Sequence, residues 1–463
     1  MKRVAIAGAS GFVGTALIDY LLKHTNYHIV SLFRRGDLSN HSRIVNVSCD
    51  LFSLMDCEKA LQNVDAAVYL VHSMLPSAKL TQGNFQDFDL IMADNFAKAA
   101  VKNGVKEIIY LGGIIPSLYE LTPHLISRLE VEEVLSTIRS AGLSFTSLRS
   151  GLILGARGSS YTILSRLVKR LPMMICPKWA SNLSSPIAIE DVVYAISKTL
   201  ENDELKNKVY DLAGSEVMTY RQMLARTAKQ MHKIRFFLNV PFFTPTLSKL
   251  WIRLVTGAPR NLVYPLITSL TANVVPDPEK QFIFPYQQKS FEQILQSIAL
   301  QEKEQGKNAP NAYEYRGQTD KNEVRSVQRL HTFFRTTARS IGNIYFEWMG
   351  IKFRPFISTK RKGEIYSVNL LNTSVSLLIL EHAPERSSED RVLFYIRGGL
   401  LAKTKVGERG RLEFRTIAHS RYTMAAIHEF HPRLPWFIYR YTQALMHLLV
   451  MRSFDRYLTE KKM

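Results

Sequence analysis

The chain has 463 residues, of which 46% are hydrophobic and 22% are charged, and its formal net charge is +20. This length predicts two or three domains, and the composition is typical of a folded globular protein, which excludes the disordered and fibrous classes. The three cysteines, Cys49, Cys57 and Cys176, are too few and too scattered for a disulfide framework or a zinc site. We therefore expect a reducing, cytoplasmic environment.

Membrane-spanning and nucleic-acid-binding classes have little support in the sequence. The most apolar stretch, residues 434–451, is interrupted by Arg440, Gln443 and His447, which predicts a packed helix instead of a membrane span. The basic excess is concentrated in residues 319–463, with 25 Lys and Arg against 13 Asp and Glu. No helix-turn-helix, RRM or zinc-finger pattern accompanies this charge, so we expect no nucleic acid partner. A solvated basic surface is the plain interpretation, and contact with an anionic membrane surface is the alternative.

Short apolar runs alternate with helical patterns over residues 1–150. The expected strands are VAIAG, HIVSLF, IVNVSC, AAVYLV, EIIYLG and FTSLRS, each continuously apolar or nearly so. The expected helices are Val13–His24, Phe85–Lys102 and His124–Ala141, the last with Thr122 as its N-cap and Pro123 at its first position. This alternation predicts an α/β domain with a doubly wound parallel sheet of the Rossmann type.

A glycine-rich loop joins the first strand to the first helix. In VAIAGASGFVG, Gly8, Gly11 and Gly14 form a GxxGxxG pattern. A tight turn requires a residue without Cβ, a diphosphate must approach backbone N–H groups closely, and the helix N-terminus carries partial positive charge. Because the pattern opens a βαβ unit, it predicts a nicotinamide dinucleotide site. The loop residues expected to form this site are Gly8, Ser10, Gly11, Phe12, Val13 and Gly14.

The end of the second strand selects the type of dinucleotide. An acidic residue there would accept hydrogen bonds from the ribose of NAD, whereas Arg34 and Arg35 are suited to a 2′-phosphate. We therefore predict NADP(H), with NAD(H) as the alternative if the two arginines only occupy a surface loop. Asp50 follows the third strand and is expected either to contact the adenine amino group or to form a plain turn.

The remaining chain is expected to form a smaller lobe and a second domain. Residues 151–300 contain short elements and several prolines, and we expect them to complete a first domain, residues 1–300, and to cover its ligand. The polar segment Gln301–Lys321 predicts a linker. Residues 322–463 are then the C-terminal domain.

The C-terminal domain combines helical and period-2 patterns. The elements expected are a helix around Glu323–Ile341, strands at Val375–Leu380, Arg391–Ile396, Arg411–Ile417 and Tyr422–Phe430, and a final helix from about Pro435 to Glu460. They predict an antiparallel sheet covered by a long helix. Its aromatic residues are expected to be core instead of ligand contacts: Phe346, Trp348, Phe353, Phe356, Trp436, Phe437 and Tyr441. His419, His428 and His431 lack the spacing of a metal site, so no metal is expected.

Residues 1–300 resemble the atypical and extended short-chain dehydrogenase/reductases, including NmrA-like regulators, NAD-dependent epimerase-like proteins and the nucleotide-binding accessory subunit of respiratory complex I. The resemblance rests on GASGFVG, CDL at Cys49–Leu51, YLVHSM at Tyr69–Met74 and SPIAIEDVV at Ser185–Val193, and it implies that Leu51 and His72 border the cofactor. The whole chain is similar to bacterial two-domain proteins whose second domain looks like the START or polyketide-cyclase (SRPBCC) helix-grip fold. That likeness implies an apolar cavity between sheet and final helix.

The chain departs from the catalytic pattern of this superfamily. In its enzymes a tyrosine and a lysine spaced i, i+4 face the nicotinamide, and a serine ends the fifth strand. Here Gly112 and Gly113 stand in place of the serine, and His124 and Arg128 in place of the tyrosine and lysine. Tyr119 has no basic residue four positions later. His124 is thus either a general acid near neutral pH with Arg128 beside it, or both residues only line the pocket edge or bind phosphate.

These features predict an NADP(H)-binding accessory protein, redox-responsive or quinone-linked, without the Ser/Tyr/Lys catalytic set. The first alternative is an NADPH-dependent oxidoreductase of a hydrophobic carbonyl or quinone, and the second is a structural scaffold with a degenerate nucleotide site. We expect a cytoplasmic protein. An apolar small molecule in the C-terminal domain and contact of this domain with the inner face of a membrane are hypotheses beside a solvated basic surface.

Overall fold

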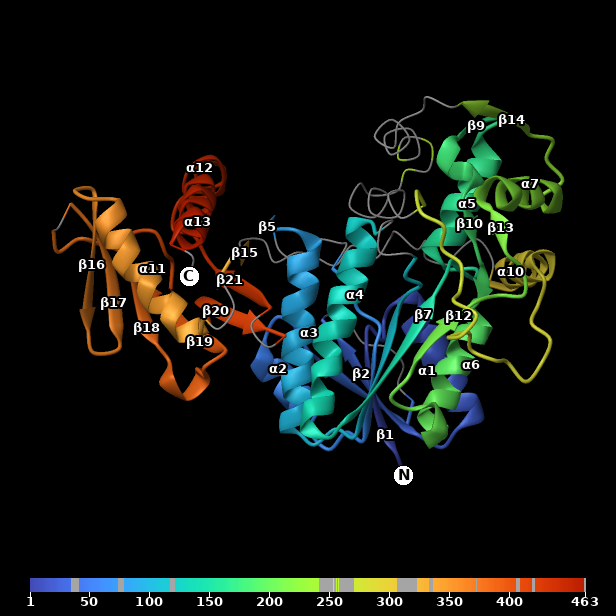
Figure 1. Ribbon diagram of the computed structural model, residues 1–463, viewed down its shortest axis with the longest axis horizontal. Coiled ribbons are helices and arrows are strands. Elements are labelled where there is room, and N and C mark those ends of the chain that lie inside the picture. The colour runs from blue at the N-terminus through green and yellow to red at the C-terminus, as the bar shows by residue number, and fades with distance from the viewer. Residues whose placement is uncertain are drawn as a thin grey trace. The chain divides into compact units, whose positions relative to one another are not determined.

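The computed structural model describes residues 1–34, 41–73, 79–116, 121–240, 253, 255, 257, 270–305, 323–332, 336–371, 373–404, 409–418 and 421–461. The chain forms two compact units (Figure 1): unit 1 contains Met1–Leu75 and Met92–Arg316, and unit 2 contains Pro76–Ile91 and Gly317–Met463. Residues 76–91, which the sequence placed in the first domain, thus group with unit 2. The reason is strand β5 (Leu80–Gln82), which pairs in parallel with β15 (Val324–Leu330).

Unit 1 is built on a seven-stranded sheet in the order β12-β7-β6-β4-β1-β2-β3. Its strands are β1 (Arg3–Ala7), β2 (His28–Phe33), β3 (Ile44–Ser48), β4 (Ala66–Tyr69), β6 (Glu107–Gly113), β7 (Ser144–Ser150) and β12 (Val209–Leu212). Every neighbouring pair is parallel, which confirms the predicted sheet. Its order reverses between β1 and β4, and open α/β sheets bind ligands at such a switch point.

Helices cover both faces of the unit 1 sheet (Figure 1). They are α1 (Phe12–His24), α2 (Leu54–Ala60), α3 (Phe85–Lys102), α4 (Pro123–Ser136) and α6 (Ile189–Glu201). Of α3, the part from Met92 onward belongs to unit 1. Helices α1 and α6 pack together on one face, and the sheet centre is fully buried because β1 and β4 are apolar on both sides. The predicted helix His124–Ala141 is confirmed as α4 followed by a short 3-10 turn, Thr137–Ala141. That turn ends at Gly142, whose φ of 80° is favourable for glycine.

A smaller lobe completes unit 1. Its elements are β8 (Ile153–Leu154), α5 (Ser159–Arg170), β9 (Met173–Pro177), β10 (Leu183–Ser184), β11 (Ile187–Ala188), β13 (Met218–Thr219), α7 (Tyr220–Gln230), β14 (Phe236–Val240) and α10 (Phe291–Gln305). The lobe has an apolar core of its own around Tyr161, Met223 and Phe291. Helix α10 includes the first five residues of the predicted linker, Gln301–Lys321, and residues 306–321 lie outside the described part of the chain.

Unit 2 contains an eight-stranded sheet in the order β16-β17-β18-β19-β20-β21-β15-β5. Its further strands are β16 (Ile357–Lys362), β17 (Ile365–Leu370), β18 (Ser376–His382), β19 (Arg391–Gly398), β20 (Arg411–Ile417) and β21 (Tyr422–Phe430). The pairs are antiparallel except β5 with β15. Helices α11 (Ala338–Lys352) and α13 (Gln443–Glu460) contribute to one aromatic-rich core with the sheet. The four predicted strands and the antiparallel sheet are confirmed.

Three expectations for unit 2 are wrong. The helix predicted at Glu323–Ile341 is strand β15 followed by α11, because pairing with β21 overrides the helix-like spacing of apolar residues. The final helix is split at Thr442 into α12 (Trp436–Tyr441) and α13, where the Thr442 backbone leaves the helical region at φ −124° and ψ −86°. Phe356, Phe437 and Tyr441, expected in the core, are 67%, 70% and 68% exposed.

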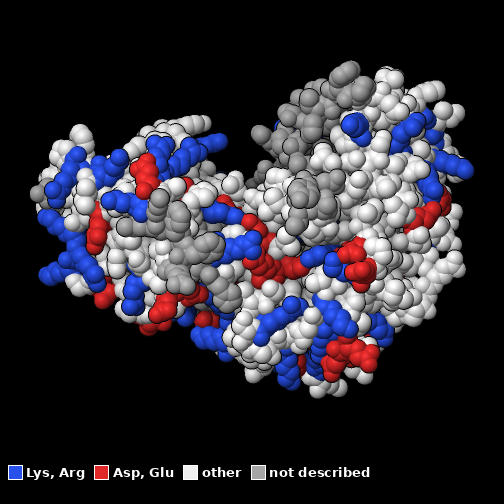
Figure 2. All heavy atoms as spheres, viewed as in Figure 1, with Lys and Arg blue, Asp and Glu red and all other residues white. Residues whose placement is uncertain are grey.

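The surface of unit 2, at the left of Figure 2, carries many Lys and Arg side chains with fewer Asp and Glu between them. This agrees with the 25 basic and 13 acidic residues of the sequence range 319–463. The three cysteines of the chain are free and buried. Over the residues that the structure describes, no helix combines the length and apolar character that crossing a bilayer requires.

Candidate functional site

The glycine loop forms a tight turn between β1 and α1. Gly8 has a φ of 90°, a conformation that other residues rarely adopt, and its carbonyl accepts a 2.9 Å hydrogen bond from the Gly11 N–H. A Cβ at Gly14 would lie 2.2 Å from the Gly8 carbonyl oxygen. Glycine at position 14 therefore lets the first turn of α1 pack directly on the loop.

The start of α1 has backbone donors that no side chain caps. Gly11 is the N-cap residue, it has no side chain to accept a hydrogen bond, and the first turn contains no acidic residue. Helix N-termini with uncapped N–H groups attract anions. Gly8, Gly11, Phe12, Val13 and Gly14 all line one pocket, so the residues present fit a dinucleotide diphosphate. Ser10 belongs to the loop but does not line this pocket.

The ends of β2 and β3 lie side by side, because Phe33 pairs with Ser48. Arg34 follows β2 directly, and its carbonyl accepts a hydrogen bond of 3.5 Å from the Ser48 hydroxyl. Asp50 holds a turn: its Oδ1 accepts the Phe52 N–H at 3.2 Å. Its neighbour, Leu51, is buried. Arg35 lies outside the described residues. Nucleotide contacts by Arg34, Asp50 and Leu51 stay predictions.

A cavity of about 400 Å³ extends from the glycine loop across the ends of β6 and β7 to helices α5 and α7. Apolar side chains make up most of its wall, and the polar or charged ones are few. The latter are His72, His124, Arg128, Ser150, Ser159, Ser160, Trp179, Ser184 and Tyr220. Ser150, Trp179 and Tyr220 were not identified from sequence. The position of Ser150 at the carboxyl end of a parallel strand was the one available signal.

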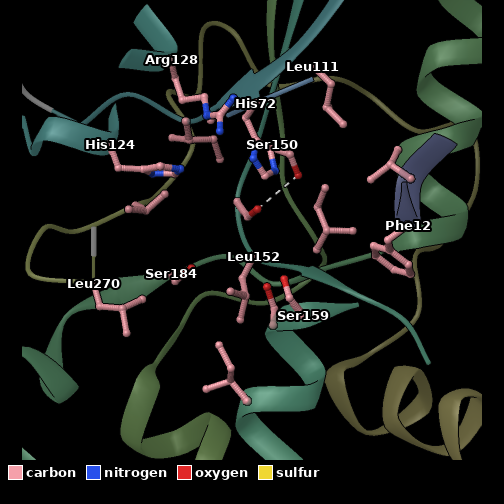
Figure 3. Close-up of a pocket in the computed structure, with 18 of the residues that line it drawn as sticks. Phe12, His72, Leu111, His124, Arg128, Ser150, Leu152, Ser159, Ser184 and Leu270 are labelled. Atoms are coloured by element: carbon pink, nitrogen blue, oxygen red, sulfur yellow. Dashed lines mark hydrogen bonds between the residues drawn. The ribbon is translucent and has the colours of Figure 1, made fainter. Parts of the chain in front are cut away.

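His72, His124 and Arg128 are brought together in this cavity (Figure 3). His124 and Arg128 lie one turn apart on α4, and His72 follows β4. Desolvation, and secondly the charge of Arg128, lowers the pKa of His72 below its ordinary value, although the residue itself is exposed. Burial and then Arg128 also hold the pKa of His124 well below its ordinary value. Both imidazoles are therefore neutral at pH 7, so His124 is not a protonated general acid in this state.

The serine of the superfamily pattern is absent from the end of β6. Gly112 and Gly113 end this strand and line the cavity. A Cβ at Gly113 would meet Leu125 at 3.5 Å, which is ordinary contact, so space alone does not require glycine there. Tyr119 lies outside the described residues. The cavity therefore brings a different polar set, His72, His124 and Arg128, to the position beside the glycine loop.

Replacing Arg128 by methionine is expected to raise the pKa of both His72 and His124. The guanidinium charge disfavours protonation of each ring, and methionine removes that charge while keeping an apolar stem of similar length. Titration of ¹³C-labelled histidines by NMR measures the shifts. Lys23→Met removes an exposed charge from the end of α1 and should leave both curves in place. If the titration curves of His72 and His124 are unchanged in Arg128→Met, the charge of Arg128 does not affect the pKa of either histidine.

The parallel sheet with a glycine loop at its central strand gives unit 1 a Rossmann-like fold. Residues 4–213 match the model of the NAD dependent epimerase/dehydratase family. The family match ends at residue 213, so it does not extend to residues 317–463 of unit 2.

Individual relatives agree with this fold. The auxiliary protein GraX of Staphylococcus aureus is 31% identical over 111 residues, a match that spans 24% of this chain and 36% of GraX. A nucleoside-diphosphate-sugar epimerase from Staphylococcus aureus has a TM-score of 0.52 at 16% identity, covering 64% of this chain and 100% of its own. The triphenylmethane reductase of Citrobacter sp., solved with NADP(H), has a TM-score of 0.50 at 15% identity, covering 64% and 100%. At these identities the two structures show the fold alone.

Proposed function

We propose that the protein binds NADP(H) at the glycine loop and serves as a redox-responsive or quinone-linked accessory protein. The observation that carries this proposal is the glycine cradle of Gly8, Gly11 and Gly14. It opens into a cavity whose described residues include neither a tyrosine–lysine pair nor a serine at the end of β6. The loop amides of Phe12 and Val13 would hold the diphosphate. When bound, the cofactor supplies a hydride donor or acceptor. Gly8, whose backbone needs glycine, and Phe12, on the cavity wall, shape the surface against which it rests.

Selection of NADP(H) is assigned to Arg34, together with Arg35 beyond it. Replacing Arg34 by glutamate is expected to reverse the preference, lowering NADPH affinity by about tenfold or more, because a carboxylate repels the 2′-phosphate and accepts hydrogen bonds from a ribose hydroxyl. Calorimetric titration with NADPH and NADH measures both affinities. Lys59→Glu makes the same charge change on the exposed surface of α2 and should leave the ratio unchanged. An unchanged ratio in Arg34→Glu would remove Arg34 from cofactor selection.

The alternative is an NADPH-dependent oxidoreductase of a hydrophobic carbonyl or quinone. The apolar cavity beside the loop supports it, with His124 and Arg128 in the polar part of the wall. NADPH oxidation measured against a panel of quinones and carbonyls separates the two functions, with His124→Ala and Arg128→Ala as variants. Turnover that these variants lose favours the enzyme, and tight NADPH binding without turnover favours the accessory protein. A scaffold with a degenerate site would bind no nucleotide, and the intact glycine loop argues against it.

For unit 2 we propose contact with an anionic membrane surface. Exposed apolar side chains lie along α12 and α13, namely Phe437, Tyr441, Leu445, Met446 and Leu449, and the unit is basic. Flotation with liposomes containing phosphatidylglycerol tests this, and protein that stays at the bottom of the gradient would contradict it. The helix-grip class and an apolar ligand in this unit stay predictions. Rings pack closely in its described core, as between Tyr345 and Phe454 with centroids 5.0 Å apart.

A further inference from the structure

Arg128 is a buried cation without a partner in the described part of the chain. Only 7% of the residue is exposed, and it lines the cavity beside the glycine loop. Its backbone carbonyl accepts a 3.2 Å hydrogen bond from the Tyr110 hydroxyl, but its guanidinium has no hydrogen bond or ion pair with any described residue. A guanidinium has five N–H donors, and those of Arg128 are not among the fully buried atoms without a partner, so they face the cavity. An anionic group of a ligand in the cavity could accept hydrogen bonds from them.

Among the residues that the structure describes, the cavity wall around Arg128 contains no group that neutralises its charge. No acidic residue occurs among the described residues that line the cavity. The sequence ranges 134–189 and 217–276, from which the described lobe residues of the wall come, contain 15 Lys and Arg and no Asp or Glu. His72 and His124, the two histidines of the cavity wall, are neutral because desolvation and the charge of Arg128 lower their pKa. The Nδ1 atom of His124 is itself buried without a hydrogen-bond partner. The polar end of the cavity therefore has donors and positive charge and lacks an anion.

The opposite part of the cavity is apolar. Its wall is formed by α5, α7 and the segments next to them, through Ile163, Leu164, Leu167, Met223, Leu224 and Leu270. In Figure 3, Leu152 and Leu270 lie away from Arg128 and His72. A ligand that fills such a cavity gains from burying apolar surface at one end and from a charged hydrogen bond at the other.

We propose that this cavity binds an apolar molecule bearing one anionic oxygen group, such as a carboxylate, with that group paired to Arg128. The guanidinium can donate two parallel hydrogen bonds to a carboxylate, and the ring nitrogens of His72 and His124 provide further polar contacts. The inference deepens the proposed function by naming the ligand class of the cavity next to the glycine loop, and it rests on that function only for the neighbouring nucleotide. It assigns Arg128 to the ligand instead of to the dinucleotide.

Two probes of equal chain length test the inference, octanoate and 1-octanol, titrated by calorimetry into the full-length protein. We expect octanoate to bind the parent protein at least about tenfold more tightly than 1-octanol, because only the carboxylate pairs with the guanidinium. Arg128→Gln should remove this preference and leave 1-octanol binding within about twofold. Arg128→Lys, which keeps the positive charge, should retain part of it. Lys23→Gln, which removes an exposed cation, should change neither affinity.

Three results would overturn the inference. The first is equal binding of octanoate and 1-octanol by the parent protein, and the second is an octanoate preference that survives Arg128→Gln. The third is a loss of NADPH affinity in Arg128→Gln as large as the loss for octanoate, which would assign the guanidinium to the dinucleotide. NADPH titrated into the same samples separates this inference from the proposed function. If the protein binds NADPH but not octanoate, the proposed ligand class is wrong and the nucleotide site stands. If it binds octanoate but not NADPH, the nucleotide site is wrong and the ligand class stands.

Discussion

Gly11→Asp is expected to weaken NADPH binding by about a hundredfold or more. Gly11 is the N-cap of α1, lines the cavity, and its Cβ position lies 3.1 Å from the Gly8 carbonyl oxygen. An aspartate there would narrow the cradle, and its carboxylate would occupy the place of the anion and repel the diphosphate. Unit charges a few ångströms apart in partly buried surroundings interact by about 3 kcal/mol. Isothermal titration calorimetry with NADPH measures the loss.

Two further substitutions at Gly11 separate shape from charge. Gly11→Ala adds only the methyl group at 3.1 Å, so a small loss of affinity is expected. Gly11→Asn has the shape of aspartate without its charge and should fall between alanine and aspartate. If asparagine and aspartate reduce NADPH affinity equally, charge repulsion is not the cause. If aspartate binds NADPH like the parent protein, the cradle does not hold the diphosphate.

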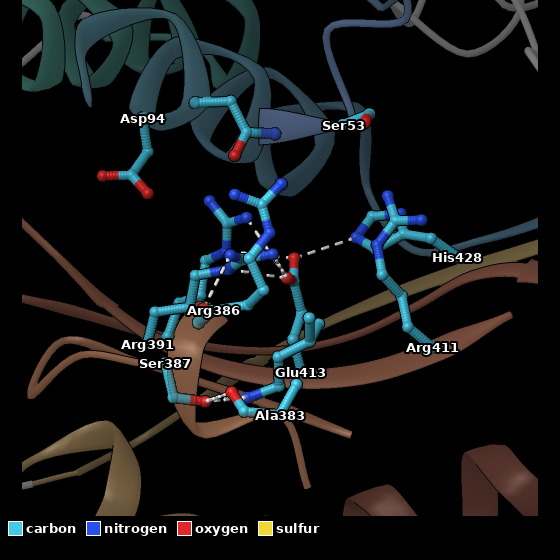
Figure 4. A network of polar contacts seen from close by, with 12 residues as sticks. Ser53, Asp94, Ala383, Arg386, Ser387, Arg391, Arg411, Glu413 and His428 are labelled. Atoms are coloured by element: carbon cyan, nitrogen blue, oxygen red, sulfur yellow. Dashed lines mark hydrogen bonds and ion pairs between the residues drawn. The ribbon is translucent and has the colours of Figure 1, made fainter. Parts of the chain in front are cut away.

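Glu413→Gln is expected to destabilise unit 2 by about 3 kcal/mol or more. Arg391 on β19 and Arg415 on β20 are directly opposite each other in the sheet, where like charges repel. Glu413 lies close to both: its Oε2 accepts hydrogen bonds from Arg391 at 3.0 Å and Arg415 at 3.2 Å. Figure 4 shows the carboxylate between Arg391 and His428. Glutamine keeps the size of the side chain and removes the charge that the two arginines share.

The ionisation states of this cluster support the expectation at neutral pH. Burial lowers the pKa of His428 to about 4, so its ring is neutral at pH 7, 3.1 Å from Glu413 Oε1. Although burial raises the pKa of Glu413, Arg415 and Arg391 hold it well below its ordinary value. This depressed pKa adds stability above the unfolded-state pKa, and the added stability is lost as the pH falls through the folded-state pKa.

Differential scanning calorimetry at pH 7 measures the effect of Glu413→Gln as a lower transition temperature. The matched control is Glu381→Gln, since Glu381 pairs with Arg397 at 2.6 Å but both side chains are about half exposed. Exposed pairs contribute little, so this control should lower the transition temperature only slightly. Equal shifts for the two variants would contradict a special role for the Glu413 cluster.

Much of unit 1 could be predicted from sequence, because its signals are local. Continuously apolar runs identified the central strands, and the glycine spacing identified the cradle before α1. The i, i+4 spacing placed His124 and Arg128 on one helix face, as observed. No local pattern shows that the Arg128 guanidinium has no partner among the described residues, because this depends on every residue that the fold brings near it.

Unit 2 shows why the spacing of apolar residues alone does not determine secondary structure or burial. Val324, Val327 and Leu330 recur at helical spacing, yet these residues form β15 because the strand pairs with β21 and β5. Residues Arg411–Arg415 of β20 alternate polar and apolar, which is typical of a strand with one face in solvent, but all seven residues of the strand are buried. Ion pairs such as Arg391–Glu413 allow this polar face to be buried. Long-range strand pairing determines the conformation of β15, and charge compensation allows the burial of β20. Neither can be recognised in a window of ten residues.

Calorimetric titration of the full-length protein with NADPH tests the central claim most directly. We expect saturable binding of one NADPH per chain, weaker binding of NADH, and loss of the NADPH signal in Gly11→Asp. A parent protein that gives no heat of binding with either nucleotide, confirmed by equilibrium dialysis, would contradict the claim that this glycine loop holds a dinucleotide.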